Sequence, residues 1–177
     1  GACMTHRKYF TMARAWGAYE GSLQEAIHHW KYEGKTNLTP FFAEWMAEGV
    51  KRYWDPDSLD LLIPVPLHTQ RLRERGFNQA LLLVKELSCR TGIPYRKTIL
   101  QKKKPTVPQV NLSGAEREKG LRGVFHVTGK EEWVGKSILL VDDVYTTGAT
   151  VNECSKVLWR GGAKRVDVLT LAHAVKR

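Results

Sequence analysis

The sequence predicts an α/β domain in which a mainly parallel sheet is flanked by helices, with a helical hood at the amino-terminal side. Three observations support this. After residue 59, apolar stretches of strand length alternate with amphipathic stretches of helical length. The 177 residues are 42% apolar, which suffices for the core of one domain. No apolar run approaches the roughly 20 residues of a membrane-spanning helix, so we expect no membrane span. The expected domain covers residues 14–177, behind a tail at 1–13.

The first third of the chain predicts two helices, which form the hood. Apolar residues recur at helical spacing over 22–30, and Ser22 with Glu25 has the spacing of a capping box. Gly34 is expected to end this helix. A second helix is expected to begin at Thr39-Pro40, because proline is favoured at the first helical position, and to run to about Tyr53.

The remainder of the chain alternates between strands and helices. Strands joined by helices imply right-handed crossovers and a parallel sheet, so ligands are expected at the carboxyl ends of the strands. Residues 102–123 have no periodic pattern, and a stretch of this length is typical of a functional flap. The expected strands are 59–65, 97–101, 137–142 and 165–172, and the expected helices are 79–90 and 149–159.

Cysteine usage indicates a reducing compartment. Cys3, Cys89 and Cys154 are widely spaced and include no Cys-x-x-Cys pair, which argues against a disulfide framework or a complete zinc knuckle. Cys89 and Cys154 fall on apolar helical faces and are expected to be small core residues. No signal peptide is recognisable, so we expect a cytoplasmic protein. The chain begins without Met, as a trimmed piece of a longer protein would.

The most informative segment is 138–150. An apolar strand leads to the adjacent carboxylates Asp142 and Asp143, and a threonine- and glycine-rich turn then opens into a helix. Backbone N–H groups at a helix start favour a phosphate dianion. The paired carboxylates would accept hydrogen bonds from sugar hydroxyls, directly or through Mg²⁺. The pattern therefore predicts a ribose 5-phosphate site. The residues expected to hold the phosphate are Thr146, Thr147, Gly148, Ala149 and Thr150.

A second buried strand delivers a basic loop to the same edge of the sheet. Residues 59–65 lead into a loop with three arginines and a glycine. Planar guanidinium groups bind phosphate oxygens in pairs, so we place a diphosphate here. Arg73 is the weakest candidate of the three arginines. The residues expected to bind pyrophosphate are Leu67, His68, Arg71 and Arg75.

The net charge of +10 arises in the middle of the chain. Residues 61–130 carry 14 basic and 4 acidic side chains, whereas the segments on either side are nearly neutral. Such localisation favours a polyanionic partner, whether phosphate, pyrophosphate or nucleic acid. A diphosphate pocket needs two or three of these cations. The surplus at Arg90, Arg96, Lys97 and Lys102–Lys104 is suited to follow a single-stranded backbone.

Four separated motifs stand in a fixed order along the chain. They are KYEGK at 31–35, IPVPLHTQRLRERGFNQA at 63–80, a flap pattern around Gln109 and Arg117, and VDDVYTTGAT at 141–150. Together they resemble the ComF family of competence-associated phosphoribosyltransferase-like proteins. Residues 138–150 also match the phosphoribosyl pyrophosphate (PRPP) motif of type I phosphoribosyltransferases. The resemblance implies the type I phosphoribosyltransferase fold and a site for PRPP, or another phosphorylated ribose, with Mg²⁺ held indirectly by Asp142 and Asp143. It also implies a role with competence proteins in DNA uptake during natural transformation.

The implied reaction is attack of a nucleophile on the anomeric carbon of PRPP, with pyrophosphate leaving. Asp142 and Asp143 would be the catalytic residues, because they can steady positive charge on the sugar. Closure of the flap would exclude water. The alternative reading is a non-catalytic module that handles single-stranded DNA and uses the fold as a phosphate-binding scaffold. The flap residues assigned to closure are Lys102, Lys103, Gln109 and Arg117.

The chain departs from the family pattern at two places. Family members usually begin with a four-cysteine zinc module, whereas only Cys3 precedes the domain here, so residues 1–13 are interpreted as a remnant of that module and zinc is not expected in this chain. The family flap usually carries an asparagine three residues after Arg117, where this chain has Gly120.

Overall fold

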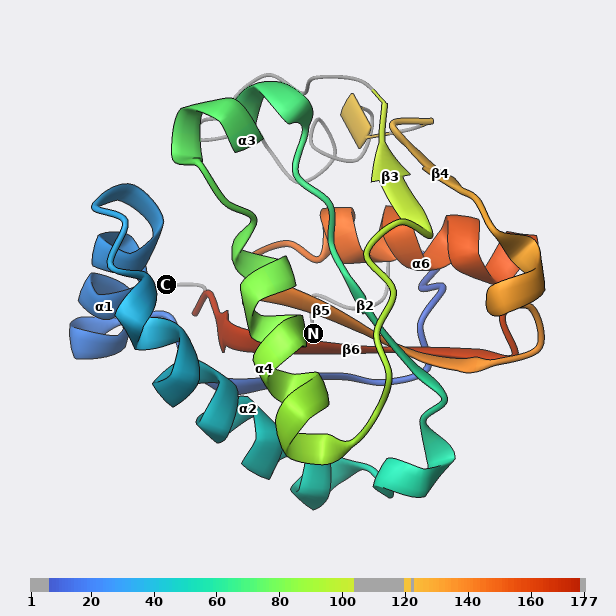
Figure 1. Ribbon diagram of the computed structural model, residues 1–177, viewed down its shortest axis with the longest axis horizontal. Coiled ribbons are helices and arrows are strands. Elements are labelled where there is room, and N and C mark those ends of the chain that lie inside the picture. Colours follow the sequence, from blue (N-terminus) through green and yellow to red (C-terminus); the bar gives the residue numbers. More distant parts are fainter. Residues whose placement is uncertain (1–6, 104–119, 122, 176–177) are drawn as a thin grey trace.

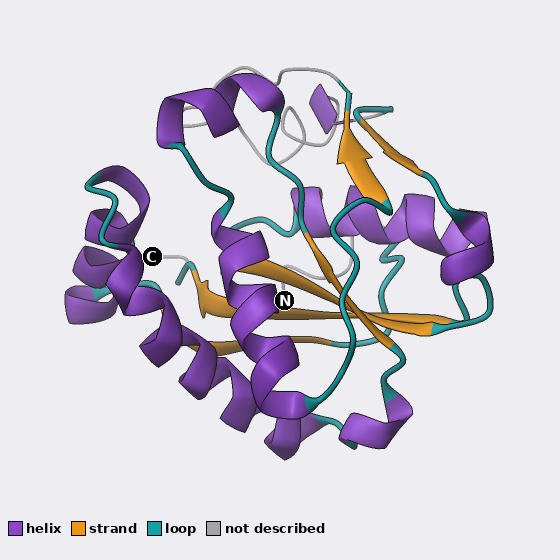
Figure 2. Cartoon of the chain, viewed as in Figure 1, coloured by secondary structure: helices purple, strands orange, loops and turns teal. Residues whose placement is uncertain are grey.

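A parallel sheet of four strands, in the order β1-β6-β5-β2, forms the centre of the computed structural model, which describes residues 7–103, 120–121 and 123–175 (Figure 1). Helices α1, α2 and α4 cover one face of this sheet, and α6 covers the other (Figure 2). The main-sheet strands are β1 (Ala13–Ala18), β2 (Leu61–Pro64), β5 (Ser137–Tyr145) and β6 (Arg165–His173). The long helices are α1 (Gly21–Tyr32), α2 (Thr39–Tyr53), α4 (Gln79–Thr91) and α6 (Ala149–Gly161).

Shorter elements surround this centre. Helix α3 (Thr69–Arg75) follows β2, and strands β3 (Leu100–Lys102) and β4 (Phe125–Val127) form a separate antiparallel pair. One-turn helices occupy Thr36–Leu38, Pro56–Ser58 and Lys130–Glu132. None of the described helices combines the length and the apolar character needed to cross a membrane. The predicted α/β architecture is confirmed.

Strand β5 organises the core because both of its faces are apolar. Ile138 and Leu140 pack in the cluster that includes α6, whereas Leu139 and Val141 pack in the cluster that includes α1, α2 and α4. Successive residues of a strand point to opposite faces, so one run of apolar residues serves both layers. All four side chains have no exposed surface. The strand pairs with β2 on one side and with β6 on the other.

Local signals place most helix ends where the sequence predicts them. Helix α2 begins at Thr39-Pro40, and Gly34 adopts a positive φ of 68° beyond the end of α1. The capping role expected for Ser22 is wrong, because α1 begins at Gly21 and its first turn has no side-chain cap. In a different helix, α4, the Asn78 carboxamide oxygen provides a side-chain cap by accepting a hydrogen bond from the Leu81 N–H at 3.4 Å.

Other expectations are corrected by tertiary pairing. The stretch before α1 is the edge strand β1, which pairs with β6 although its sequence, ARAWGA, has no strand pattern. The basic segment after β2 is partly helical (α3), not a loop. The strand expected at 97–101 begins only at Leu100 and pairs antiparallel with β4, outside the main sheet. Cys154 is buried as expected, but Cys89 is exposed.

Two helical glycines test how tightly the layers pack. A Cβ on Gly161, at the end of α6, would collide with the buried ring of Trp133, whereas a Cβ on Gly49, inside α2, would rest 3.7 Å from Leu169 Cδ1 in ordinary contact. We expect Gly161→Ala to lower the free energy of unfolding by about 1–3 kcal/mol through overpacking. Gly49→Ala should raise it by about 0.5–1 kcal/mol through helix propensity. Urea unfolding of both variants checks this, and equal stabilisation by both would contradict it.

Candidate functional site

The predicted site segments meet at the carboxyl end of the sheet. Pro64 of β2 is the register partner of Val141 of β5, and the Val65 N–H donates to the Val141 carbonyl at 2.9 Å. The segment that carries Leu67 and His68 therefore starts beside Asp142. The turn into α6 follows the same strand, beginning directly after Tyr145.

The two carboxylates lie inside β5 and not beyond its end, which corrects the expected strand boundary. Asp142 pairs in register with Thr170 of β6, and the strand continues to Tyr145. Because strand residues alternate in direction, the Asp142 side chain faces the α6 layer and Asp143 faces the α1 layer. The Asp143 backbone N–H donates to Asp142 Oδ1 at 2.9 Å. The acidic pair is thus split between the two layers but joined through the backbone.

Helix α1 supplies the counter-ion for Asp143. Lys31 Nζ lies 2.8 Å from Asp143 Oδ1, and the side chains are only 14% and 17% exposed. A charge pair with so little solvent is weakly screened, so losing either partner would leave the other charge uncompensated. Lys31 is in the last turn of α1, which places a cation at the negative end of the helix.

Burial raises the pKa of Asp142 to about 7, and the negative charge of Asp143 adds to the rise. The Asp143 N–H, Lys31 and Lys102 oppose the shift, because each favours the charged carboxylate. Near neutral pH, Asp142 therefore exchanges between a proton donor and a carboxylate acceptor. This is the behaviour expected of a group that gains a cationic or hydroxyl partner when a ligand arrives.

Lys102 interacts with the acidic pair, whereas Lys103 is exposed and its charge acts on His126. Burial lowers the pKa of Lys102, whose charge interacts with those of Asp142 and Arg71, and its ammonium lies 5.7 Å from the centre of the Phe125 ring. Lys103 is exposed, and its backbone N–H donates to the Val124 carbonyl at 2.9 Å. The other predicted flap residues, Gln109 and Arg117, lie outside the described residues.

The turn at 146–149 connects β5 directly to α6. Thr146 and Thr147 are exposed, and Gly148 adopts a φ of 78° at the start of α6. The Tyr145 ring occupies the space that a Cβ at position 148 would need, so glycine is required there for two reasons. The Ala149 N–H donates to Thr147 Oγ1 at 3.4 Å, and Thr150 follows in the first helical turn.

The basic segment folds into α3 and presents its cations differently from a loop. His68 Nδ1 accepts a hydrogen bond from the Gln70 N–H at 3.2 Å, so the imidazole caps α3. Leu67 is half-buried just before it. Arg71 is half-buried and close enough to lower the pKa of Lys102, whereas Arg73 is exposed. Of the predicted arginines in α3, Arg71 is thus the one whose charge acts on Lys102.

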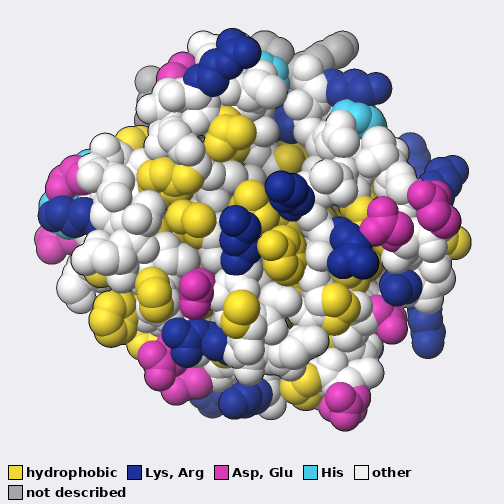
Figure 3. Space-filling model, in the orientation of Figure 1, with side chains coloured by type: hydrophobic (Ala, Val, Ile, Leu, Met, Phe, Trp, Pro, Cys, Tyr) yellow, Lys and Arg dark blue, Asp and Glu magenta, His cyan; other side chains and the backbone are white. Residues whose placement is uncertain are grey.

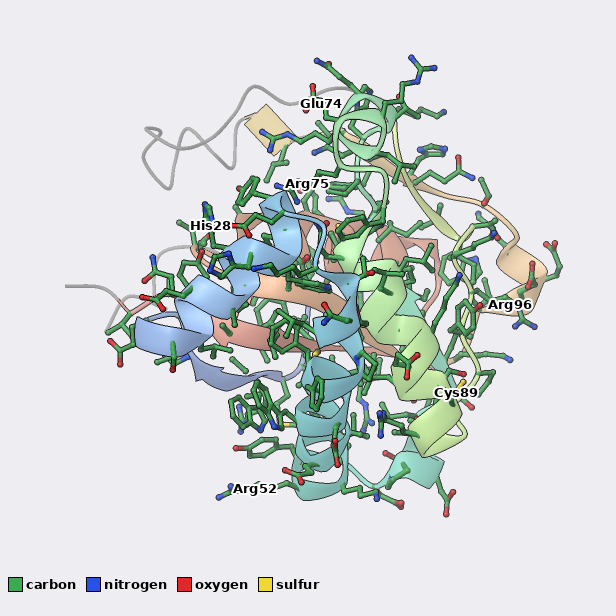
Figure 4. All side chains as sticks on the ribbon, turned by 60° about the vertical axis from the view of Figure 1, so that its left-hand side comes forward. His28, Arg52, Glu74, Arg75, Cys89 and Arg96 are labelled. Carbon is green, nitrogen blue, oxygen red and sulfur yellow. The ribbon has the colours of Figure 1, made fainter. Side chains whose placement is uncertain are left out.

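Arg75 connects α3 to the end of α1. Its Nη1 donates to Gln79 Oε1 at 3.2 Å, and its guanidinium lies 5.0 Å from the centre of the Tyr32 ring. His28 packs on the same tyrosine, with ring centres 4.7 Å apart, and Figure 4 shows His28 and Arg75 on the same side of α1. Gln79 is buried, and its Nε2 has no hydrogen-bond partner among the described residues.

Three site residues were not assigned roles from the sequence: Lys31, Tyr32 and Gln79. Local periodicity places the first two on an amphipathic helix without indicating their direction. The signal that marks them is the KYEGK motif, which contains both. Gln79 stands in the second motif, next to Asn78.

The acidic pair fits Mg²⁺ only as part of a substrate complex. Within the described part of the chain, no three His, Cys, Asp or Glu side chains are grouped as a metal cage. Mg²⁺ usually retains waters and is held by one or two carboxylates together with substrate phosphates. Asp142 and Asp143 are two adjacent carboxylates of this kind, and Lys31 and Lys102 are the cations beside them.

The fold defines the class to which the chain belongs. It matches the glutamine PRPP amidotransferase of B. subtilis with a TM-score of 0.52 at 21% identity, over 77% of this chain and 26% of that enzyme, and thus has the type I phosphoribosyltransferase fold. No family model matches the chain. It is 33% identical to competence protein F of Haemophilus influenzae over 98% of this chain and 78% of that protein. The chain belongs to the ComF family.

Two further relatives extend this assignment. Competence protein ComFC of Streptococcus pneumoniae is 30% identical over 98% of this chain and 70% of its own length. The DNA utilization protein YhgH of Escherichia coli is 29% identical over 89% of this chain and 70% of its own length.

The raised pKa of Asp142 predicts a pH-dependent stability. The folded protein holds the proton more tightly than the unfolded chain, so this carboxyl destabilises the fold increasingly from about pH 4 to about pH 7. Asp142→Asn keeps an oxygen for the Asp143 N–H and should raise the free energy of unfolding by about 1–3 kcal/mol at pH 8. The gain should shrink below pH 5. Urea unfolding across this range checks it, with Asp57→Asn in an exposed turn as the matched charge change. A gain independent of pH would refute the assignment.

Proposed function

We propose that this protein binds PRPP, or another phosphorylated ribose, together with Mg²⁺ at the carboxyl end of β2 and β5. The observation that carries the proposal is the convergence of a partly buried acidic pair with cations from two other elements, Lys31 of α1 and Lys102 of β3. Arg71 of α3 adds a third cation beside Lys102. Such a site suits a ligand with diol and phosphate groups close together. The type I phosphoribosyltransferase fold supports the same ligand.

Each part of the ligand has a matching part of the site. The turn from Thr146 to Thr150 offers backbone N–H groups and hydroxyls to the 5-phosphate. Asp142 and Asp143 accept hydrogen bonds from the ribose hydroxyls. Arg71 and Arg75 face the pyrophosphate, and Lys102 adds positive charge beside it. Leu67 and His68 shape the approach from β2.

The chemistry that this arrangement supports is transfer of the phosphoribosyl group. A nucleophile bonds to the anomeric carbon as the carbon–oxygen bond to pyrophosphate breaks, and the electron pair leaves with pyrophosphate. The protein contributes by positioning the donor and by stabilising charge at both ends of the breaking bond. Asp142 in its carboxylate form steadies the positive charge on the sugar. The cations stabilise the leaving group.

Mg²⁺ would neutralise part of the pyrophosphate charge when bound. Asp142 and Asp143 would hold it indirectly, through the ribose hydroxyls or water. Binding should therefore require the carboxylate form of Asp142 and strengthen as pH rises through 7.

A role in DNA uptake is the second part of the proposal. The relatives named competence protein F and DNA utilization protein YhgH support it, as does the net charge of +10. Phosphoribosyl binding and DNA handling are compatible, because the acidic pair and the remaining basic surface are different parts of the protein.

Calorimetry with PRPP tests the proposed site. We expect binding only with Mg²⁺ and a loss of about 100-fold in affinity for Asp142→Asn with Asp143→Asn, because two charge-assisted hydrogen-bond acceptors are lost. Glu44→Gln with Glu48→Gln, on the exposed face of α2, makes the same charge change as a control. Unchanged PRPP affinity in the first double variant would show that the acidic pair does not bind the sugar.

A further inference from the structure

A second surface combines basic and aromatic side chains at the opposite end of the sheet. It lies where the segment before β1 runs along α6, from Asn152 to Trp159, and meets the start of β6 (Figure 1). Thr170, the register partner of Asp142, is five residues beyond Arg165 on β6, or roughly 17 Å at the usual rise of a strand. We call this second surface the α6 patch. Its residues are Arg7, Lys8, Tyr9, Trp159, Lys164 and Arg165.

The centre of the α6 patch is an aromatic pair with a guanidinium beside it. The ring centres of Tyr9 and Trp159 are 5.8 Å apart, and the Arg7 guanidinium lies 5.3 Å from the first and 5.5 Å from the second. Trp159 is nevertheless 48% exposed. About half of the indole surface therefore faces water, where an aromatic ring of a ligand can stack on it.

The α6 patch is held in place by hydrogen bonds from α6. The Tyr9 N–H donates to Asn152 Oδ1 at 2.9 Å, and Asn152 Nδ2 donates back to the Arg7 carbonyl at 3.2 Å. One asparagine thus fixes the backbone that carries both Arg7 and Tyr9. A ligand would find the rings and cations already ordered, which lowers the entropic cost of binding.

The charge of the α6 patch is positive. The patch surrounds a hollow of about 210 Å³, and none of the described residues that line it is acidic. Acidic groups nearby are already occupied: Asp167 is buried against Arg165 at 3.0 Å, and Glu153 pairs with Lys156 at 2.9 Å. Arg7, Lys8 and Lys164 therefore supply the field that an anion would meet.

We propose that the α6 patch binds single-stranded nucleic acid, with a base stacked on Trp159 and the adjoining phosphates beside Arg7 and Lys164. Aromatic faces interleaved with cations match a chain in which bases and phosphates alternate. A free phosphate would use the cations but not the indole, and duplex DNA keeps its bases stacked inside. The proposal extends the DNA-handling part of the proposed function to a surface independent of the phosphoribosyl site.

The basic middle segment is less suited to this role where the structure describes it. Arg96 pairs with Glu132 at 2.6 Å, and Arg90 donates to the Pro40 carbonyl at 3.2 Å. On the face shown in Figure 3, basic side chains stand apart with apolar ones between them. Cations that are paired or separated by apolar surface do not form a stripe for a phosphate backbone.

Fluorescence anisotropy with a labelled oligothymidylate of about 15 nucleotides tests the proposal in the complete chain. We expect Trp159→Ala to weaken binding about tenfold, and Trp159→Phe to restore most of it, because stacking needs only an aromatic face. Arg7→Ala with Lys164→Ala should weaken binding and make the dependence on salt shallower, by about 1.4 in the log–log slope. The control variant Lys51→Ala with Lys85→Ala removes the same charge from exposed sites on α2 and α4. It should change neither the affinity for the oligonucleotide nor the dependence of that affinity on salt.

Several outcomes would overturn the proposal. The proposal is wrong if Trp159→Ala and the double variant Arg7→Ala with Lys164→Ala both bind the oligonucleotide with wild-type affinity. Equal losses for duplex and single strand, or binding only to vesicles of anionic lipid, would assign the α6 patch to another partner. Thermal unfolding identifies variants that fail to fold. If Trp159→Ala is one of them, the oligonucleotide affinities of Trp159→Phe and of the double variant Arg7→Ala with Lys164→Ala decide whether the proposal holds. Binding of PRPP by the same variants should be unchanged, so this test and that of the phosphoribosyl site fail separately.

Discussion

The structure depends on two adjacent carboxylates that lie within β5, directly after an apolar run that serves both faces of the sheet. Two like charges with little access to water are costly, and the fold offsets that cost with cations from separate parts of the chain. Lys31 reaches Asp143 from α1, and Lys102 approaches Asp142 from β3. The hood, the sheet and the small β3–β4 pair are therefore joined electrostatically at one point. A ligand bound there contacts elements that are distant in sequence.

Much of this arrangement could be predicted from local pattern. The apolar run from Ile138 to Val141, the asparagine before α4 and the glycine after α6 each carry a physical signal, and the corresponding elements are present. Strand β1 could not be found, because its conformation comes from pairing with β6 and not from its own residues. Helix α3 has no buried side chain, so it has no apolar periodicity to detect.

The candidate site was predictable in its segments but not in its contacts. The acidic pair, the glycine turn and the arginines stand out by residue type, and parallel topology brings them to one edge. That Lys31 rather than Lys35 meets Asp143 depends on how α1 packs, with Ile27 and Trp30 buried beneath it. Tertiary packing also decides that Lys102 interacts with the acidic pair while its neighbour Lys103 is exposed. Such choices are set by neighbouring layers, which no local pattern encodes.

The position of strand β1 at the edge of the sheet affects how readily the protein aggregates while it folds. It is the outermost strand of the described sheet, with one side of its backbone paired to β6. Exposed strand edges recruit other chains, and a bulky cation there discourages such pairing. Arg14 is exposed on this strand, and Trp16 stacks on Trp45 with ring centres 4.3 Å apart. We therefore expect the open edge of β1 to recruit few other chains before folding is complete.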